Sequence, residues 1–271
     1  MKLNTRKIRN HKVALGKEPL QMLTCYDFQT AGLLNETELD MILVGDSVGN
    51  VILGYDTTVK VSLDEMKVFS SAVKRGAPDK FVVADLPFGT YSTLEKGVNS
   101  AIELFQYSQV EAVKCEGAFD YQLEMIKRIT EVGIPVMGHI GLTPQSVHQQ
   151  GGYYTHGKDQ ASSDELLRQA RALEQAGVFS LVLECVEKEA ADKITQVISI
   201  PTIGIGAGLK TDGQVLVLND LLKMGPHQPP KFCTPIANLF DLKKDLVRKY
   251  IINNKELIQN YWKEHGSSLH H

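Results

Sequence analysis

The chain has 271 residues, enough for one large domain or two small ones. Its 29 Lys and Arg residues against 32 Asp and Glu residues give a formal net charge of −3, which disfavours nucleic acid or a membrane surface as a partner. With 43% hydrophobic and 23% charged residues, the composition excludes a disordered, collagen-like or coiled-coil chain and predicts a globular protein.

The cysteines and the two ends of the chain indicate the cellular compartment in which the protein is expected. Four cysteines without a CxxC pair are typical of reduced thiols, not of a disulfide framework or a zinc cluster. The N-terminus lacks a secretory signal and no apolar run is long enough to span a membrane, so we expect a cytoplasmic protein. The basic stretch from Lys2 to Lys12 is interpreted as a solvated arm, and residues 266–271 resemble a fragment of an expression tag.

Short apolar runs alternate with stretches of helical periodicity, which is typical of βα units in a parallel sheet. The runs predict eight strands: Leu20–Thr24, Met41–Gly45, Phe81–Asp85, Ala112–Cys115, Pro135–His139, Ser180–Glu184, Thr202–Ile205 and Val215–Leu218. Eight units favour a single-domain (β/α)8 barrel over residues 1–271 rather than an open doubly wound sheet, because no GxGxxG turn follows the first run. Beyond the eighth strand, residues 239–264 predict an additional C-terminal helix.

Two segments between the strands have a clear amphipathic pattern: Leu63–Lys74 and Glu165–Ala176. Ser62 and Glu65 form a capping box at the start of the first segment. Gly76 and Gly177 follow the two segments and are predicted to end these helices.

Polar residues stand at the ends of the predicted strands, where a barrel would gather them at one mouth. They are Asp46, Ser47, Asp85, Lys114, Glu116, His139 and Glu184. Lys114 and Glu116 are two residues apart on a strand, so both side chains project to the same side.

The acidic residues of this set suggest a metal site. Asp46, Asp85 and Glu116 offer hard oxygen ligands, and Cys115, next to Glu116 on the strand, points the other way, which favours Mg²⁺ over Zn²⁺. The alternative is that each acid caps the helix that follows it.

Glu184 and His139 are candidates for proton transfer. Glu184 ends an apolar run, where burial would raise its pKa and suit it to general-base catalysis, but a structural ion pair with Lys114 is equally compatible. His139 could carry a proton, although a second role, ordering a neighbouring carboxylate, explains its position better.

Three glycine-containing segments follow the later strands. Residues 141–158 are long for a βα connection and predict a lid over the mouth or a flexible surface loop. Residues 204–208 would allow an anionic ligand to approach the backbone closely, and Asp212-Gly213 is interpreted as a turn.

Several motifs in order along residues 20–235 carry a resemblance to a known family. They are Met22-Leu23-Thr24-Cys25-Tyr26-Asp27, Val44-Gly45-Asp46-Ser47, Ala84-Asp85-Leu86-Pro87-Phe88-Gly89, Val113-Lys114-Cys115-Glu116-Gly117, Gly138-His139-Ile140-Gly141-Leu142-Thr143-Pro144-Gln145, Ile203-Gly204-Ile205-Gly206-Ala207-Gly208 and Asp212-Gly213-Gln214-Val215-Leu216. With these motifs the chain resembles the ketopantoate hydroxymethyltransferases of pantothenate biosynthesis.

The resemblance implies a barrel enzyme in which Asp46 and Asp85 hold Mg²⁺ with Glu116 in the metal shell. It also implies that Glu184 is the base. The substrate-binding residues it implies are Asp46, Ser47, Asp85 and Lys114.

The implied reaction joins 2-oxoisovalerate to the one-carbon unit of 5,10-methylenetetrahydrofolate. Loss of the C3 proton would give an enolate that is stabilised by the metal and an ammonium group, and its attack on the folate methylene would give ketopantoate and tetrahydrofolate. The resemblance also implies a homo-oligomer, usually a decamer, in which the C-terminal helix contacts a neighbouring subunit.

Two alternatives remain open. One is a Mg²⁺-dependent carbon-carbon lyase or phosphomutase of the phosphoenolpyruvate and isocitrate lyase type, although its Lys-Lys-Cys-Gly-His motif is missing from this sequence. The other is a catalytically silent barrel that binds a keto acid.

Overall fold

The structure is a computed structural model that describes residues 2–265. It divides into two compact units, Met1–Leu218 and Asn219–His271, and each is described by itself. The sequence that resembles a tag fragment, residues 266–271, lies outside the described residues. Within residues 2–265, no helix combines the length and the hydropathy needed to cross a membrane.

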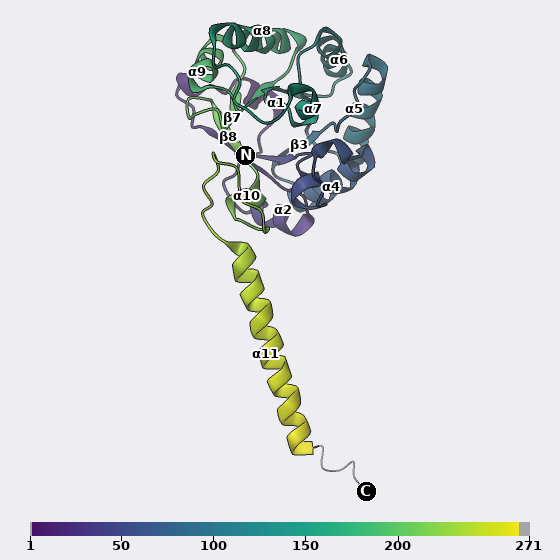
Figure 1. Cartoon of the computed structure of the whole chain (residues 1–271). Helices are drawn as coiled ribbons and strands as arrows, with labels where there is room; N and C mark the ends of the chain where they lie inside the picture. The colour runs from purple at the N-terminus through teal and green to yellow at the C-terminus, as the bar shows by residue number, and fades with distance from the viewer. Residues whose placement is uncertain (1, 266–271) are drawn as a thin grey trace. The chain divides into compact units, whose positions relative to one another are not determined.

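Eight parallel strands of the first unit form a closed barrel in which each strand pairs with the next in the sequence (Figure 1). The strands are β1 (Leu20–Thr24), β2 (Met41–Val44), β3 (Phe81–Asp85), β4 (Ala112–Lys114), β5 (Val136–Gly141), β6 (Ser180–Glu184), β7 (Thr202–Ile205) and β8 (Gly213–Leu216). Pairing of β1 with β8 closes the barrel. The predicted (β/α)8 fold is therefore confirmed.

Helices surround the strands (Figure 1). In this unit the α-helices are α1 (Thr5–Arg9), α2 (Phe28–Asn35), α3 (Val48–Val51), α4 (Leu63–Gly76), α5 (Leu94–Ser108), α6 (Asp120–Glu131), α7 (Val147–Gln150), α8 (Gln160–Ala176) and α9 (Lys188–Val197). Short 3₁₀ helices are η1 (Val13–Leu15), η2 (Thr58–Lys60) and η3 (Pro144–Ser146). The longer helices α4, α5, α6, α8 and α9 pack against one another in chain order and cover the outside of the barrel.

The predicted helix ends are confirmed, since α4 ends at Gly76 and α8 ends immediately before Gly177. Ser62 Oγ accepts the Glu65 N–H at 3.2 Å, and Glu65 Oε2 accepts the Ser62 N–H at 2.7 Å, which completes the capping box of α4. Gly177 follows α8 with a left-handed φ of 101°. Gly76 is the last residue of α4, and a Cβ there would lie 2.4 Å from Phe28 O, so this glycine also allows α2 to pack closely.

The last strand begins two residues earlier than its apolar run predicts. The Asp212-Gly213 pair, interpreted as a turn, leads directly into β8, and Gly213 pairs with Leu20 of β1. A Cβ on Gly213 would lie 2.6 Å from Leu20 O, so the pairing requires glycine. At the other end, Leu218 no longer belongs to the strand; its N–H donates to Thr24 Oγ1.

Apolar side chains from the strands fill the barrel interior. Met41, Phe81 and Phe179 belong to one buried cluster, and the two phenylalanine rings meet edge to face with centroids 5.6 Å apart. This packed interior supports the carboxyl ends of the strands as a rigid platform.

The N-terminal segment is part of the barrel rather than a solvated arm. Lys12 is 9% exposed, and its Nζ lies 2.6 Å from Asp212 Oδ2 and 2.7 Å from Thr195 O. Asp212 also accepts the backbone N–H groups of Val13 and Thr202, each at 3.0 Å. The basic stretch was therefore interpreted wrongly at Lys12, because its partner lies 200 residues away in the sequence.

The second unit contains most of α10 (Leu218–Leu221) and all of α11 (Leu239–His265). The Ile236 N–H donates to Leu221 O at 2.9 Å, so the connecting loop folds back onto α10. Asn238 Oδ1 accepts the Asp241 N–H at the start of α11. The predicted C-terminal helix is confirmed, and none of its described side chains is buried.

Candidate active site

The carboxyl ends of β2 to β6 bring the predicted site residues together. Most of these side chains are buried although they carry charge or polar nitrogen: Asp46, Asp85, Lys114, Glu116 and His139 are each between 2% and 4% exposed. Glu184, at the end of β6, is less enclosed, with 17% of its side chain exposed. Such a group of buried ionisable residues is typical of a functional site.

Lys114 lies at the centre of this cluster. Its Nζ is 3.0 Å from Asp85 Oδ1 and 3.3 Å from His139 Nδ1. Burial opposes its charge, but the carboxylates of Asp85, Glu116 and Asp46 outweigh burial and raise the Lys114 pKa. Lys114 is therefore a permanent cation among the acids.

Asp46 and Asp85 are held together through the backbone. Asp85 Oδ2 accepts the Asp46 N–H at 3.0 Å. Burial, and then the charge of Asp85, raises the pKa of Asp46 to about 7. Burial, and then the charge of Asp46, also raises the pKa of Glu116 well above its usual value. The negative charges of these carboxylates thus destabilise one another, and a bound cation would relieve their repulsion.

His139 bridges the centre of the cluster to Glu184. Since a lysine ammonium has no lone pair, His139 Nδ1 must accept from Lys114, which places the ring proton on Nε2. Nε2 in turn lies 3.3 Å from Glu184 Oε2. Burial, and then the charge of Lys114, lowers the His139 pKa, so the ring is neutral. This geometry favours the role of ordering a carboxylate, and it pairs Glu184 with His139 while Lys114 pairs with Asp85.

Ser47 follows Asp46 and forms a hydrogen bond that sequence reasoning missed. Its Oγ lies 2.7 Å from the hydroxyl of Tyr26, which is 3% exposed and follows β1. Burial raises the Tyr26 pKa, so the phenol keeps its proton. The motif from Met22 to Asp27 contains Tyr26, but only the closed barrel shows that it reaches the end of β2.

The donor set fits a hard divalent cation. Four carboxylates, Asp46, Asp85, Glu116 and Glu184, face one lysine, and Asp85 Oδ1 is buried without a well-formed hydrogen bond. Oxygen donors and excess negative charge suit Mg²⁺. Within residues 2–265 no three acidic, histidine or cysteine side chains form a ready metal-ligand group. The backbone N–H of Asp46 donates to Asp85 Oδ2, which keeps these two candidate ligands next to each other.

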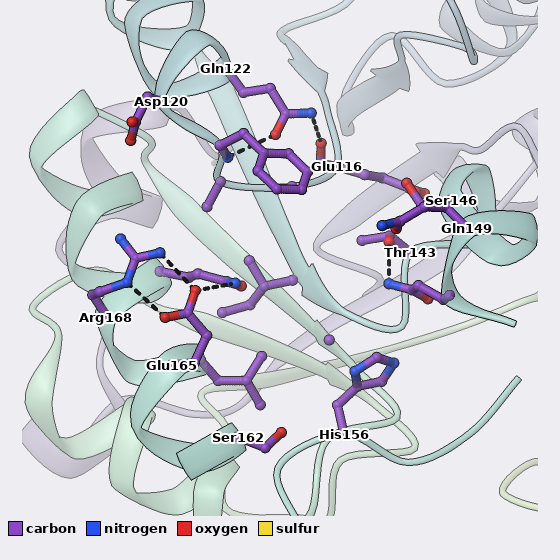
Figure 2. A pocket seen from close by; sticks show the side chains of 18 residues that line it. Glu116, Asp120, Gln122, Thr143, Ser146, Gln149, His156, Ser162, Glu165 and Arg168 are labelled. Atoms are coloured by element: carbon purple, nitrogen blue, oxygen red, sulfur yellow. Dashed lines mark hydrogen bonds and ion pairs between the residues drawn. The ribbon is translucent and has the colours of Figure 1, made fainter.

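A cavity of about 390 Å³ lies beside the cluster and shares Glu116 with it (Figure 2). Phe119, Gln149, Gln169 and the Glu165–Arg168 ion pair contribute to its lining. Figure 2 shows that this ion pair belongs to α8 and faces the first turn of α6. The cavity therefore offers amides and an aromatic ring to a planar polar ligand.

Comparison with known proteins gives the family. The family model described as ketopantoate hydroxymethyltransferase matches residues 2–257. A 3-methyl-2-oxobutanoate hydroxymethyltransferase of Leptospira interrogans is 49% identical over 87% of this chain and 89% of its own length. The enzyme of that name from Thermotoga maritima is 47% identical over 89% of this chain and 87% of its own.

Solved structures that are similar to this chain support the fold. A phosphoenolpyruvate phosphomutase from Streptomyces platensis subsp. rosaceus superposes with a TM-score of 0.62 at 12% identity, covering 97% of this chain and 91% of its own. An oxaloacetate acetylhydrolase reaches a TM-score of 0.58 at 14% identity, covering 93% and 98%. These identities are too low to carry a function. The family predicted from the sequence motifs is confirmed by the closer relatives: the chain belongs to the ketopantoate hydroxymethyltransferase family.

Proposed function

We propose that this protein transfers a hydroxymethyl group from 5,10-methylenetetrahydrofolate to 2-oxoisovalerate, the 3-methyl-2-oxobutanoate in its relatives' names, and so forms ketopantoate for pantothenate biosynthesis. The observation that carries the proposal is the group of four carboxylates around one lysine at the barrel mouth, three of which, Asp46, Asp85 and Glu116, are buried with the lysine. An α-keto acid brings its carboxylate oxygen and its keto oxygen to this already acidic site. The site can accept these oxygens only if positive charge, such as the lysine ammonium and a bound cation, offsets their negative charge.

Asp46 and Asp85 would hold Mg²⁺, with Glu116 beside them. When bound, this ion supplies a Lewis acid for the keto acid. Lys114 would bind the substrate and stabilise the negative charge that develops on the keto oxygen, since its ammonium is buried where charge interactions are strong. Ser47 would orient the substrate through its hydroxyl, which Tyr26 holds in place.

Glu184 would remove the proton from C3 of the keto acid. It is the most exposed carboxylate of the cluster, and its Oε2 lies 3.3 Å from His139 Nε2, so its other oxygen would remain for the substrate. The electron pair left on C3 then forms the new carbon-carbon bond to the one-carbon unit, whose bonds to the two folate nitrogens break. One water molecule supplies the hydroxyl of the product, and the folate nitrogens take up one proton from that water and one from C3, so that ketopantoate and tetrahydrofolate result.

The cavity beside Glu116 is the site that we propose for the folate. Its amide side chains could pair with a pterin, and Phe119, which is 65% exposed, offers a face for stacking.

We further propose a cytoplasmic homo-oligomer, a decamer by resemblance to the family. The cysteines among the described residues are free, as expected in a reducing compartment. Along α11, Leu246, Tyr250 and Trp262 are each more than half exposed, so this helix offers apolar surface to a neighbouring subunit.

The test is exchange of the C3 hydrogen of 2-oxoisovalerate in D₂O, followed by NMR with and without Mg²⁺ and then with tetrahydrofolate. We expect Mg²⁺-dependent exchange that falls at least ~100-fold in Glu184→Gln. The control Glu189→Gln changes an exposed acid on α9 and should exchange like the wild type.

Other outcomes would contradict the proposal. Intact substrate binding without exchange would favour the silent keto-acid barrel. Cleavage of a carbon-carbon bond in an oxyacid would favour the lyase alternative, whose fold the similar structures share.

A further inference from the structure

Gln145 is a buried amide at the barrel mouth that the proposed reaction does not yet use. It lies in η3, immediately after β5, and is 5% exposed. A buried amide is unfavourable unless its donors and acceptor are all paired. Its partners therefore indicate what the residue does.

The side-chain amide of Gln145 is fully paired. Nε2 donates to Asp46 Oδ2 at 2.8 Å and to Leu86 O at 3.0 Å. Oε1 accepts from the hydroxyl of Tyr91 at 2.5 Å. A flipped amide would place Oε1 against a carboxylate and a carbonyl oxygen, so this arrangement fixes the amide orientation.

The backbone of Gln145 binds a second carboxylate. Its N–H donates to Glu116 Oε2 at 3.1 Å. One residue thus connects the acids that follow β2 and β4. Tyr91 supports the same arrangement, because its hydroxyl also accepts the Glu116 N–H at 3.4 Å.

We propose that Gln145 is a positioning residue that orients the carboxylates of Asp46 and Glu116 for a divalent cation, with Tyr91 fixing its amide. This inference rests on the proposed function, in which these acids bind or adjoin Mg²⁺. The bond to Oδ2 of Asp46 fixes the plane of that carboxylate and leaves Oδ1 for the cation. Groups that orient metal ligands in this way typically affect metal affinity by 10-fold to 100-fold.

The test measures Mg²⁺ binding by isothermal titration calorimetry without substrate. Gln145→Met keeps the length of the side chain and the backbone N–H to Glu116, but removes the amide. We expect ~10-fold to 100-fold weaker Mg²⁺ binding. The Mg²⁺ concentration for half-maximal activity should rise by the same factor, while excess Mg²⁺ restores most of kcat.

Gln122 provides a matched control. It is also a buried glutamine whose amide is hydrogen-bonded at both atoms: its Nε2 donates to Glu116 O at 2.9 Å and its Oε1 accepts the Phe119 N–H at 3.0 Å. Neither partner is a carboxylate. Gln122→Met should therefore bind Mg²⁺ within about threefold of the wild type, since the two hydrogen bonds that it loses go to backbone groups and not to a carboxylate that would hold the cation.

Three outcomes would overturn the proposal. If the wild type binds Mg²⁺ and Gln145→Met binds it within twofold, Gln145 does not position the ligands, although the proposed function stands. If Gln122→Met weakens binding as much, the effect reflects general packing. If the wild type does not bind Mg²⁺ at all, both this inference and the metal assignment are wrong.

Tyr91→Phe keeps the proposal testable if Gln145→Met does not fold. It removes the hydroxyl that donates to Oε1, so the amide can rotate, together with the long 3.4 Å contact from the Glu116 N–H. We expect a roughly threefold to tenfold loss of Mg²⁺ affinity, with unchanged circular dichroism. Wild-type affinity in this variant would contradict the role of Tyr91 in fixing the amide.

Discussion

Replacing Lys12 by methionine should strongly destabilise the barrel. Methionine keeps an unbranched apolar side chain but leaves the carboxylate of Asp212, which is 1% exposed, without its cation. Thr195 O and Ile200 O lose a donor as well. Breaking a buried ion pair by removing one partner typically costs about 3–5 kcal/mol. For a unit of this size, such a loss lowers Tm by about 6–20 °C.

The assay is thermal and urea unfolding of the full chain, followed by circular dichroism. The double variant Lys12→Met/Asp212→Asn should recover about 1 kcal/mol or more relative to Lys12→Met, because it removes the stranded charge. The control Lys193→Met breaks an ion pair with Asp164 whose side chains are 46% and 55% exposed, and should change stability by less than about 1 kcal/mol. The reasoning is refuted if Lys12→Met behaves like that control.

Two further predictions concern the active site. Burial raises the pKa of Asp46 to about 7 in the folded protein without a cation. Between about pH 4 and pH 7 the folded protein therefore keeps the Asp46 proton that the unfolded chain has lost, so the stability of the fold falls as pH rises through this range. Mg²⁺ needs the ionised carboxylate, so it should raise Tm more at pH 8 than at pH 6, and an equal rise at both values would contradict this. Phe119→Ala should raise the KM for methylenetetrahydrofolate about tenfold. C3 exchange measured without folate should stay within about twofold, and a parallel loss of exchange would contradict the assignment of the cavity.

The strands and the acids at their ends could be predicted from the sequence because both signals are local. An apolar run marks a buried strand, and Asp46, Asp85 and Glu184 each stand where such a run ends. Barrel closure then makes them neighbours. The prediction was less accurate at β8, where Asp212-Gly213 has the composition of a turn but begins a strand.

The residues that position the acids of the site could not be predicted, because no local pattern in the sequence marks them. Tyr91 and Gln145 lie in connecting segments, and their roles depend on hydrogen bonds between residues 54 positions apart. Two glycines of residues 204–208 also adjoin this protein's own side chains: a Cβ on Gly208 would lie 3.0 Å from Lys188 Cγ, and one on Gly204 would lie 2.8 Å from Thr211 Oγ1. Such contacts arise only from tertiary packing. That an anionic ligand approaches this segment stays a prediction.

Closure of the barrel through β1 and β8 has a consequence for the protein's synthesis. The partner of Leu20 is Gly213, so the ribosome must add nearly 200 residues after β1 before the ring can close, which takes roughly 10–40 s at ordinary elongation rates. During that time the outer edge of β1 has open backbone hydrogen-bonding groups and can pair with another nascent chain. Chaperone demand should therefore be greatest late in translation, when every residue of the proposed catalytic cluster has already been made.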